Sequence, residues 1–308
     1  MEKHQEIYDE ISKEIERAGF KINEQKTHLQ FRDSKQKVTG LVVNKKISVD
    51  RIYYKKTRAM AFSLYSGGSF EIDGEQGTIN QLEGRFAFIN QLDRYNNKLS
   101  PGKNDFRSLN SREKQYQKFL YYKYFFANEK PLVVTEGKTD IRYLKAAIKN
   151  LCDEYPNLIT RISEKEFEFK VSFLRRTKRL NYFLSIAQDG ADTISGIYKF
   201  SQTNSEKGFT KYLDYFNRFD NAKPKNPVIL IFDNEQNGDQ TNGKNSKNKP
   251  LQKFISLINL DNESNEEFKK KLRHNILENF YLLTNQLVKD KDQCEIEDLF
   301  KSECGIKK

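Results

Sequence analysis

Several residue types that commonly cross-link or anchor a fold are scarce in this sequence. Tryptophan is absent, and the only cysteines are Cys152, Cys294 and Cys304, with no CxxC spacing. An odd number of scattered cysteines indicates neither a disulfide framework nor a zinc site. No run approaches the ~18 apolar residues of a membrane-spanning helix, and the N-terminal residues lack the apolar core of a signal peptide. We therefore expect a soluble cytoplasmic protein with no membrane partner.

Charge and aromatic rings are abundant instead. Charged residues make up 31% of the chain and hydrophobic ones 36%, with 23 Phe, 16 Tyr and a net charge of +11. Lys and Arg that neutralise phosphates gain free energy from counterion release, so a basic chain favours a nucleic-acid partner, with a membrane surface as the weaker alternative. A length of 308 residues allows one large domain or two ordinary ones. We expect two.

An apolar run over residues 132–135 is followed by Glu136, Gly137 and then Asp140, which opens a helical pattern over residues 140–151. Ligands of open α/β sheets collect outside the carboxyl ends of the strands, so these carboxylates are functional candidates by position. Glu136 is the candidate catalytic residue and Asp140 a candidate metal ligand. The alternative for Asp140 is a cap on the helix that follows.

A second buried strand, residues 228–232, ends in Asp233, Asn234 and Glu235. Alternation along an extended backbone puts Asp233 and Glu235 on one side, so their carboxylates can converge on one cation. Mg²⁺, or Mn²⁺ in its place, prefers oxygen ligands and keeps several waters. The two strand ends together predict a divalent metal site.

The rest of the second half alternates between strand and helix. We predict strands at 167–173 and 182–186 and a helix at 208–219, which is typical of a parallel sheet covered on both faces. Residues 234–250 are nearly all polar and predict a mobile loop at the mouth of the site. His274 lies in an amphipathic stretch, residues 266–288, and favours a core or surface position over a catalytic one.

The first half predicts helices at 2–19, 57–65, 79–96 and 112–126, a strand at 38–44, a break at 66–69 and a loop at 97–111. Gly40 allows a phosphate to approach the backbone closely. A basic and aromatic surface suited to RNA follows, consisting of Lys45, Lys46, Arg51, Tyr53, Tyr54, Lys55, Lys56 and Arg58. The alternative is a solvated helix with core tyrosines.

Two short motifs in the first half carry a family resemblance. Residues 19–23 (GFKIN), followed by Lys26 and Thr27, resemble the last palm motif of reverse transcriptases. Val38, Thr39 and Gly40 resemble the Val-Thr-Gly signature of retron reverse transcriptases, which lies where that family recognises its structured non-coding RNA. The resemblance implies that these three residues contact RNA.

Polymerisation in that family needs a Tyr-x-Asp-Asp pair in an upstream palm, and no adjacent Asp pair occurs in this sequence. We therefore expect no polymerase activity from this chain alone. Either the chain begins late, or a separate chain supplies the missing polymerase region.

The strand-end motifs resemble the TOPRIM domain of topoisomerases, primases and OLD-type nucleases, in which one strand ends Glu-Gly and a later one ends Asp-x-Asp. Here the second motif is Asp233-x-Glu235. In order and spacing the chain is similar, over essentially its whole length, to retron reverse transcriptases with a fused C-terminal TOPRIM nuclease. The resemblance implies that Glu136 acts in proton transfer or metal binding and that Asp233 and Glu235 are the main metal ligands.

Further positions follow from the same resemblance. Residues 297–300 (EDLF) resemble a late acidic motif of the OLD-type relatives, which makes Glu297 a further metal ligand. Residues 185–192 take the place of a middle strand end, where Asp189 and Asp192 either join the metal shell or cap a turn. The family continues with a Lys-containing segment past this point, so we expect the C-terminus to be incomplete.

The predicted fold class is α/β, with an N-terminal α+β remnant of a reverse transcriptase palm and a helical thumb before a TOPRIM-like parallel domain. The predicted domains are residues 1–66 (end of the palm, start of the thumb), 67–130 (thumb and connector) and 131–308 (nuclease). The implied function is antiphage defence, in which the chain binds structured RNA and its DNA copy and hydrolyses nucleic acid. A non-catalytic RNA-binding scaffold is the competing hypothesis. A primase-like or topoisomerase-like enzyme fits the site but not the basic first half.

Overall fold

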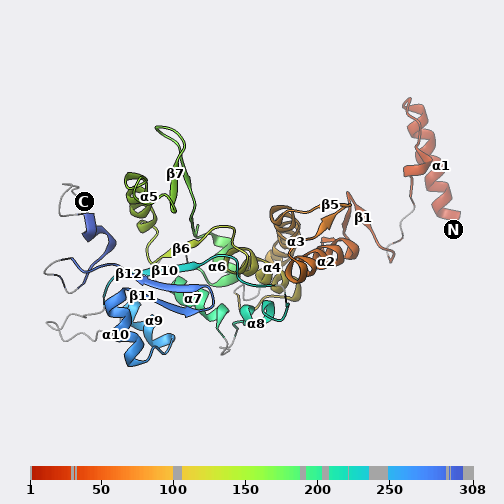
Figure 1. Ribbon diagram of the computed structural model, residues 1–308. Coiled ribbons are helices and arrows are strands. Elements are labelled where there is room, and N and C mark those ends of the chain that lie inside the picture. Colours follow the sequence, from red (N-terminus) through yellow and green to blue (C-terminus); the bar gives the residue numbers. More distant parts are fainter. Residues whose placement is uncertain are drawn as a thin grey trace.

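The computed structural model describes residues 2–28, 31, 33–99, 106–187, 192–202, 208–220, 222–235, 249–288, 291 and 293–300. A helical half and a half built on a mixed sheet follow one another along the molecule (Figure 1). Helix α1 (Glu2–Arg17) stands apart from the other elements at one end, close to the predicted range of 2–19. Its link to the following residues includes a hydrogen bond from the Tyr8 hydroxyl to Glu24 in η1 (Glu24–Lys26), at 2.9 Å.

The predicted strand at 38–44 is in fact a turn between two strands. β1 (Lys37–Val38), β2 (Leu41–Val42) and β3 (Ser48–Val49) form a small antiparallel sheet. Thr39 and Gly40, which join β1 to β2, both have positive φ, 47° and 84°. Two-residue hairpin turns of this kind match the right-handed twist of the strands and favour glycine, which explains why an apolar run folds back here. The Val-Thr-Gly motif is therefore a hairpin tip.

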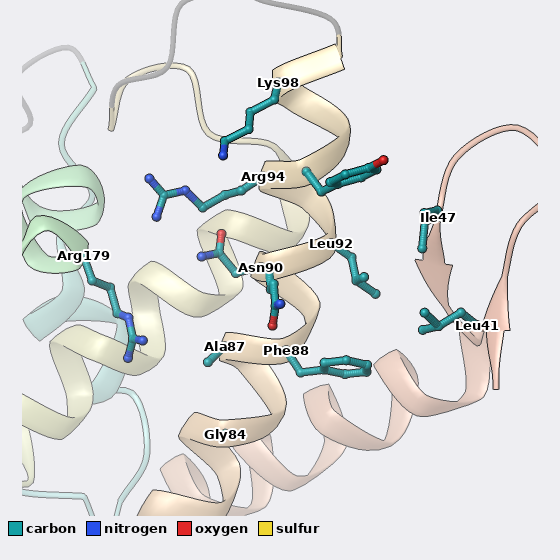
Figure 2. A pocket seen from close by; sticks show the side chains of 12 residues that line it. Leu41, Ile47, Gly84, Ala87, Phe88, Asn90, Leu92, Arg94, Lys98 and Arg179 are labelled. Carbon is teal, nitrogen blue, oxygen red and sulfur yellow. The ribbon is translucent and has the colours of Figure 1, made fainter. Parts of the chain in front are cut away.

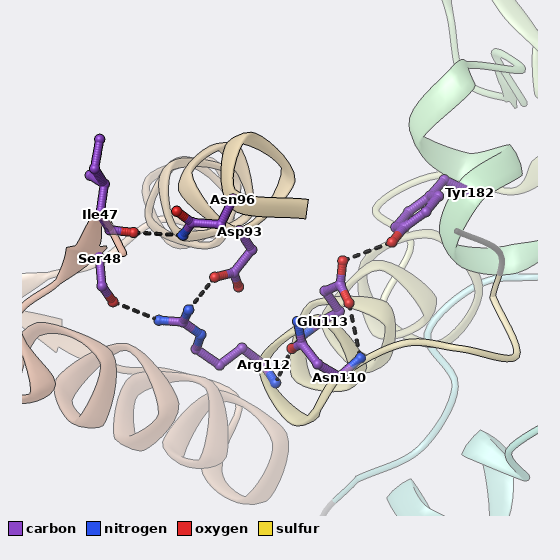
Figure 3. A network of polar contacts seen from close by, with 8 residues as sticks. All are labelled: Ile47, Ser48, Asp93, Asn96, Asn110, Arg112, Glu113 and Tyr182. Atoms are coloured by element: carbon purple, nitrogen blue, oxygen red, sulfur yellow. Dashed lines mark hydrogen bonds and ion pairs between the residues drawn. The ribbon is translucent and has the colours of Figure 1, made fainter. Parts of the chain in front are cut away.

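Helix α2 (Arg51–Gly67) follows β3, and polar contacts join the start of β3 to the helices α3 (Ile79–Leu99) and α4 (Ser111–Tyr121) (Figure 3). On α3, Asn96 donates to the Ile47 carbonyl at 2.8 Å, and Asp93 is ion-paired with Arg112 of α4. Arg112 also donates to the Ser48 hydroxyl at 2.9 Å. A short hairpin, β4 (Glu71–Ile72) with β5 (Glu75–Gln76), connects α2 to α3.

The helix predicted over residues 112–126 carries aromatic residues at helical spacing, a pattern that favours core packing over base stacking, and the structure buries most of them. α4 continues into a π-helical turn, η2 (Tyr122–Phe126), and both pack against the sheet half. Gln117 of α4 donates to the Phe183 carbonyl at 2.6 Å and accepts from the Tyr212 hydroxyl at 2.5 Å. One cluster of buried apolar side chains thus continues across the predicted boundary at residues 130 and 131.

The main sheet has the strand order β11-β12-β10-β6-β9. β9 (Ser172–Phe173), β6 (Leu132–Thr135), β10 (Val228–Phe232) and β12 (Phe280–Thr284) run parallel, and β11 (Arg273–Leu277) is an antiparallel edge. The sheet is therefore mixed, with a parallel centre. The amphipathic stretch predicted at 266–288 divides into the end of helix α10 (Asn262–Lys271) and the β11–β12 hairpin, which carries His274 on β11.

One strand prediction is wrong, and another is split between two strands. Residues 182–186 fall mostly in helix α6 (Lys178–Leu184), whose start is capped by the Thr177 hydroxyl accepting from Leu180 N–H. Leu180, Phe183 and Leu184 are all buried, which is helical spacing. The predicted strand at 167–173 divides between β8 (Phe167–Phe169), which pairs with β7 (Ile159–Arg161) in a separate hairpin, and β9. The helix predicted at 208–219 is shorter, α8 (Tyr212–Phe216).

Helices lie on both sides of the main sheet. Figure 1 shows α5 (Asp140–Asn150) on one side and α7 (Asp192–Ser201), α9 (Pro250–Leu257) and α10 on the other. The 3-10 turn η4 (Ile296–Phe300) packs on α5, where the Tyr143 and Phe300 rings stack at 5.6 Å. Cys152 and Cys294 are buried free thiols, and Cys304 lies outside the described residues. Within the described residues, no helix combines the length and apolarity that crossing a bilayer requires.

Candidate metal site and nucleic-acid surface

Three parallel strands of the main sheet end at one edge, and a polar residue follows each. Thr135 pairs with Ile231, and Phe232 pairs with Thr284, so β6, β10 and β12 end at nearly the same level. Glu136, Asp233 and Asn285 are the residues directly after them. The carboxyl ends of parallel strands are the expected position for a ligand site in an α/β fold.

The turn from β6 to α5 holds Asp140 toward this edge. The Thr135 hydroxyl donates to the Gly137 carbonyl at 2.6 Å, and Gly137 N–H donates to Asp140 Oδ2 at 2.8 Å. A Cβ on residue 137 would lie 2.6 Å from Asp140 Oδ1, so a larger residue there would force the Asp140 carboxyl group to move. Asp140 thus closes the turn before α5 and does not cap that helix in the way the alternative predicted, because Thr139 occupies the N-cap position; the charge of Asp140 acts on Asp233.

Asp233 and Glu136 are linked through the backbone. Asp233 Oδ1 accepts from the Asn285 side chain and from Ile296 N–H, each at 3.2 Å. The Asp233 backbone N–H lies near the Glu136 carboxyl and partly offsets the rise in its pKa. The neighbouring segment is fixed by a β-bridge in which Asn234 and Cys294 exchange N–H···O bonds of 2.9 Å. These contacts place the two carboxyl groups on one side of the strand ends.

Both carboxyl groups resist ionisation. Burial, followed by the charges of Asp233 and Glu235, raises the pKa of Glu136 to about 7. Burial, followed by the charge of Asp140, raises the pKa of Asp233 to about 7. Desolvation and like charge both disfavour a carboxylate, and a cation placed between the groups would relieve both.

Glu235 is partly neutralised by a lysine. Its Oε1 lies 3.2 Å from Lys249 Nζ, and Lys249 also donates to Gln293 Oε1 at 2.8 Å. Its other oxygen, Oε2, is buried without a hydrogen-bond partner among the described residues. Glu235 therefore stands at the site with one oxygen engaged and one open.

The remaining predicted acidic positions are less tightly joined to the site. Glu297 lies on η4, half-buried, and its charge contributes to raising the pKa of Asp233. Asp192 is exposed in the first turn of α7. Asp189 lies outside the described residues, as do residues 236–248 of the predicted mobile loop.

Sequence reasoning missed two residues at this edge. Asn285 positions Asp233, and the apolar run of β12 directly before it was the signal that could have revealed it. Arg176 donates to the Thr135 and Glu136 carbonyls, the latter at 2.7 Å, and so brings a guanidinium to the end of β6. Arg176 reaches this position because β9 pairs with β6, and no short-range sequence pattern predicts that pairing.

The donor set suits a hard divalent cation. Glu136 Oε2, like Glu235 Oε2, is buried and lacks a hydrogen-bond partner in the described part of the chain. Among the described residues, no group of three or more Asp, Glu, His or Cys side chains is arranged so that it could hold a metal ion. Mg²⁺ typically takes one or two carboxylates and keeps several waters, so an open set of carboxylates fits it better than a dedicated cage would.

We expect the substitution Gly137→Ala to disturb this site at its turn. The added Cβ must push Asp140 away or distort the backbone, which costs roughly 1–2 kcal/mol of stability. Urea denaturation would measure that cost, and the increase in melting temperature with added Mg²⁺ should shrink in parallel. Gly84→Ala in α3 is the matched control, because a Cβ there meets no atom within 4 Å and should leave stability unchanged or slightly higher.

The residues predicted to bind nucleic acid occupy two places. Val38, Thr39 and Gly40 lie at the exposed tip of the β1–β2 hairpin, and Lys45 and Lys46 lie in the exposed turn before β3. On α2, helical spacing puts Arg51, Lys55 and Arg58 on one stripe and Lys56 on another. All of these side chains except Gly40 can reach solvent, so the structure leaves them free to meet a partner.

The two tyrosines of α2 are partly engaged within the protein. The Arg85 guanidinium lies 4.2 Å from the centre of the Tyr53 ring, and Phe88 meets that ring edge-on at 6.1 Å. Tyr54 is half-buried, and burial raises its pKa. Both rings thus contribute to packing within the protein, as the alternative interpretation of core tyrosines on a solvated helix expected.

A groove of about 920 Å³ runs between the hairpin and α3 and extends toward α6 (Figure 2). Phe88 and Leu92 point toward Leu41 and Ile47 of the hairpin, whereas Arg94 and Lys98 point toward the α6 side. Asn90, which also lines the groove, has a buried Oδ1 without a partner among the described residues. The basic and aromatic character predicted for α2 therefore extends over α3.

Comparison with known proteins adds no identification: no family model matches the chain, and no solved structure matches it.

Proposed function

We propose that this protein is a metal-dependent phosphodiesterase that cleaves nucleic acid at the strand ends of its main sheet. The observation that carries the proposal is that Glu136 and Asp233 follow adjacent parallel strands that end at one sheet edge, with raised carboxyl pKa values, and that Glu136 and Glu235 each have an unpartnered buried oxygen. Perturbed carboxyl groups of this kind cluster at functional sites. A net charge of +11 supports a polyanionic substrate.

Each residue has a distinct part in this reaction. Asp233 and Glu235 would hold Mg²⁺ or Mn²⁺, supported by Asp140 and Glu297. When bound, the metal supplies charge neutralisation on the phosphoryl oxygens and lowers the pKa of a coordinated water. Glu136, with a pKa of about 7, can accept and return a proton near neutral pH. Asn285 and Ile296 N–H keep Asp233 oriented.

The resemblance to retron reverse transcriptases with a fused TOPRIM nuclease supports the same function. On that basis we propose that the hairpin tip and the basic stripe of α2 bind structured RNA or its DNA copy, and that the protein acts in antiphage defence. The replacement of the second Asp by Glu235 lengthens that side chain by one methylene, and its carboxylate still has an oxygen available for a metal.

A non-catalytic nucleic-acid-binding scaffold is the second candidate, and one contact favours it. The Lys249 ammonium already lies beside Glu235, where it supplies part of the charge that a cation would otherwise provide. If this ion pair persists at millimolar Mg²⁺, the carboxylates have a structural role and do not bind metal.

Purified protein incubated with labelled single-stranded and double-stranded RNA and DNA separates the two candidates. The phosphodiesterase proposal expects cleavage with Mg²⁺ or Mn²⁺ that stops when EDTA removes the metal. Binding of any of these substrates without metal-dependent cleavage would support the non-catalytic scaffold instead. Replacing Lys249 with methionine should strengthen metal binding, measured by calorimetry, since it frees Glu235 Oε1.

A further inference from the structure

A second polar cleft, of about 400 Å³, lies between α2, α4 and α8, in the helical half. Three cations line it: Lys55 and Arg58 from α2 and Lys118 from α4. Gln115 and Tyr215 complete its polar wall, and no Asp or Glu of the described residues lines it. Positive charge is thus concentrated in a concave site without an internal counter-ion.

Lys118 is the most constrained of these cations. It is half-buried, and among the described residues it forms no ion pair with a carboxylate. Its ammonium lies 3.5 Å from the centre of the Tyr215 ring, and the Arg218 guanidinium lies 4.6 Å from the same centre. Burial, followed by the charges of Arg218 and Arg58, lowers the pKa of Lys118 to about 8. The folded protein therefore keeps like charges together at a cost that an anion would remove.

An unpartnered buried donor borders the same cleft. Tyr65 lines it, is 2% exposed, and has a hydroxyl that lacks a hydrogen-bond partner within the described residues. Buried hydroxyl groups in folded proteins are ordinarily satisfied, so an unpartnered one beside a basic cleft points to a ligand that accepts hydrogen bonds. Phosphate oxygens are strong acceptors and carry the complementary charge.

We propose that this cleft is a phosphate-binding site, built by Lys118 and Arg58 with Lys55 at its rim, for a phosphate group of a nucleotide. The cleft itself supports a phosphate. That the phosphate belongs to a nucleic-acid strand rests on the proposed function. The site would fix the register of a strand on the helical half, away from the carboxylates of the main sheet. Lys118 lies on α4, a helix whose aromatic spacing favours core packing. The site therefore combines Lys118 with Lys55 and Arg58 of the predicted basic stripe on α2.

Fluorescence anisotropy with a labelled 12-nucleotide strand, in EDTA so that no cleavage is needed, tests the proposal. Lys118→Met keeps the apolar stem and removes the charge, and we expect it to weaken binding about tenfold. The slope of log affinity against log salt should also fall by about one. Lys114→Met, at an exposed position one turn earlier on α4, is the matched control and should change affinity less than twofold.

A second ligand identifies the source of the phosphate. A nucleoside monophosphate that binds the wild type and loses affinity in Lys118→Met shows that the site accepts a free nucleotide, whereas an effect confined to the strand shows a backbone phosphate. Either result supports the site. Arg58 is exposed, so Arg58→Gln should not disturb folding. We expect this variant to weaken binding of the same ligand that Lys118→Met affects.

Equal binding of both ligands by wild type, Lys118→Met and Arg58→Gln overturns the site. That result leaves the phosphodiesterase proposal standing if metal-dependent cleavage persists. Conversely, Lys118-dependent nucleotide binding in a protein that cleaves nothing keeps the site and removes the proposed function.

Discussion

Replacing Glu136 with glutamine is expected to lower the rate of metal-dependent cleavage by at least about a hundredfold, while the protein stays folded. General acid–base groups typically contribute between about 10² and 10⁴ to a rate. Glutamine keeps the size of the side chain and a carbonyl oxygen that can accept from the nearby Asp233 backbone N–H. It cannot take up a proton, so the variant separates proton transfer from packing.

Initial rates on the best substrate, measured at several Mg²⁺ concentrations, give the comparison. Glu129→Gln is the matched control, because Glu129 is an exposed glutamate three residues before β6. It should behave as the wild type does within twofold. The same cleavage rate in wild type and Glu136→Gln would show that Glu136 takes no part in the chemistry, whatever its pKa.

The parts of this site that the sequence predicts are those written in continuous local patterns. β6 and β10 are buried apolar runs, and each is followed at once by acidic residues, so Glu136 and Asp233 could be located without a structure. Asp140 was also placed, since the turn at Gly137 has a short-range signature. These patterns do not show how deeply the side chains are buried. The raised pKa values of Glu136 and Asp233 arise from that burial, which depends on tertiary packing.

Other features depend on contacts between distant residues. Asn285 matters because β12 pairs with β10, and the apolar run of β12 was only a weak signal for it because no acidic residue follows that run. The three apolar residues of α6 fit a short strand as well as a helix, and the Thr177 cap together with packing on α4 decided for the helix. Short apolar runs are ambiguous in this way because they contain too few residues to distinguish the helical repeat from the strand repeat.

The basic cleft illustrates the same limit for binding sites. Lys55 and Arg58 were recognised as a basic stripe, which is a property of α2 alone. Neither Lys118 nor Tyr65 was singled out by a sequence pattern. Only the packing of α4 against α2 brings a half-buried cation and an unpartnered hydroxyl to one cleft.

The stability of the metal-free protein should fall as pH rises from about 5.5 to about 8. The folded chain holds the pKa of Glu136 and of Asp233 at about 7, above their ordinary values. The folded state therefore binds protons more tightly than the unfolded state does. The resulting stabilisation is fully present below the ordinary carboxyl pKa and is lost as pH passes through about 7.

One pKa unit corresponds to ~1.4 kcal/mol. Allowing for the part of each carboxyl that reaches solvent and for their mutual repulsion, we expect a loss of roughly 3 kcal/mol across this range. Thermal unfolding in EDTA should show it as a decrease in melting temperature of roughly 5 °C. Glu136→Gln removes one of the two titrating groups, so its decrease should be about half as large.

Divalent metal should reverse the trend, since a cation binds the ionised carboxylates and must displace protons at low pH. Millimolar Mg²⁺ is therefore expected to raise the melting temperature at pH 8 much more than at pH 5.5. Equal shifts at both pH values would mean that the metal binds away from Glu136 and Asp233. Metal-free stability that rises between pH 5.5 and 8 would contradict the close approach of the carboxyl groups, because separated carboxylates exposed to water carry no penalty for ionising.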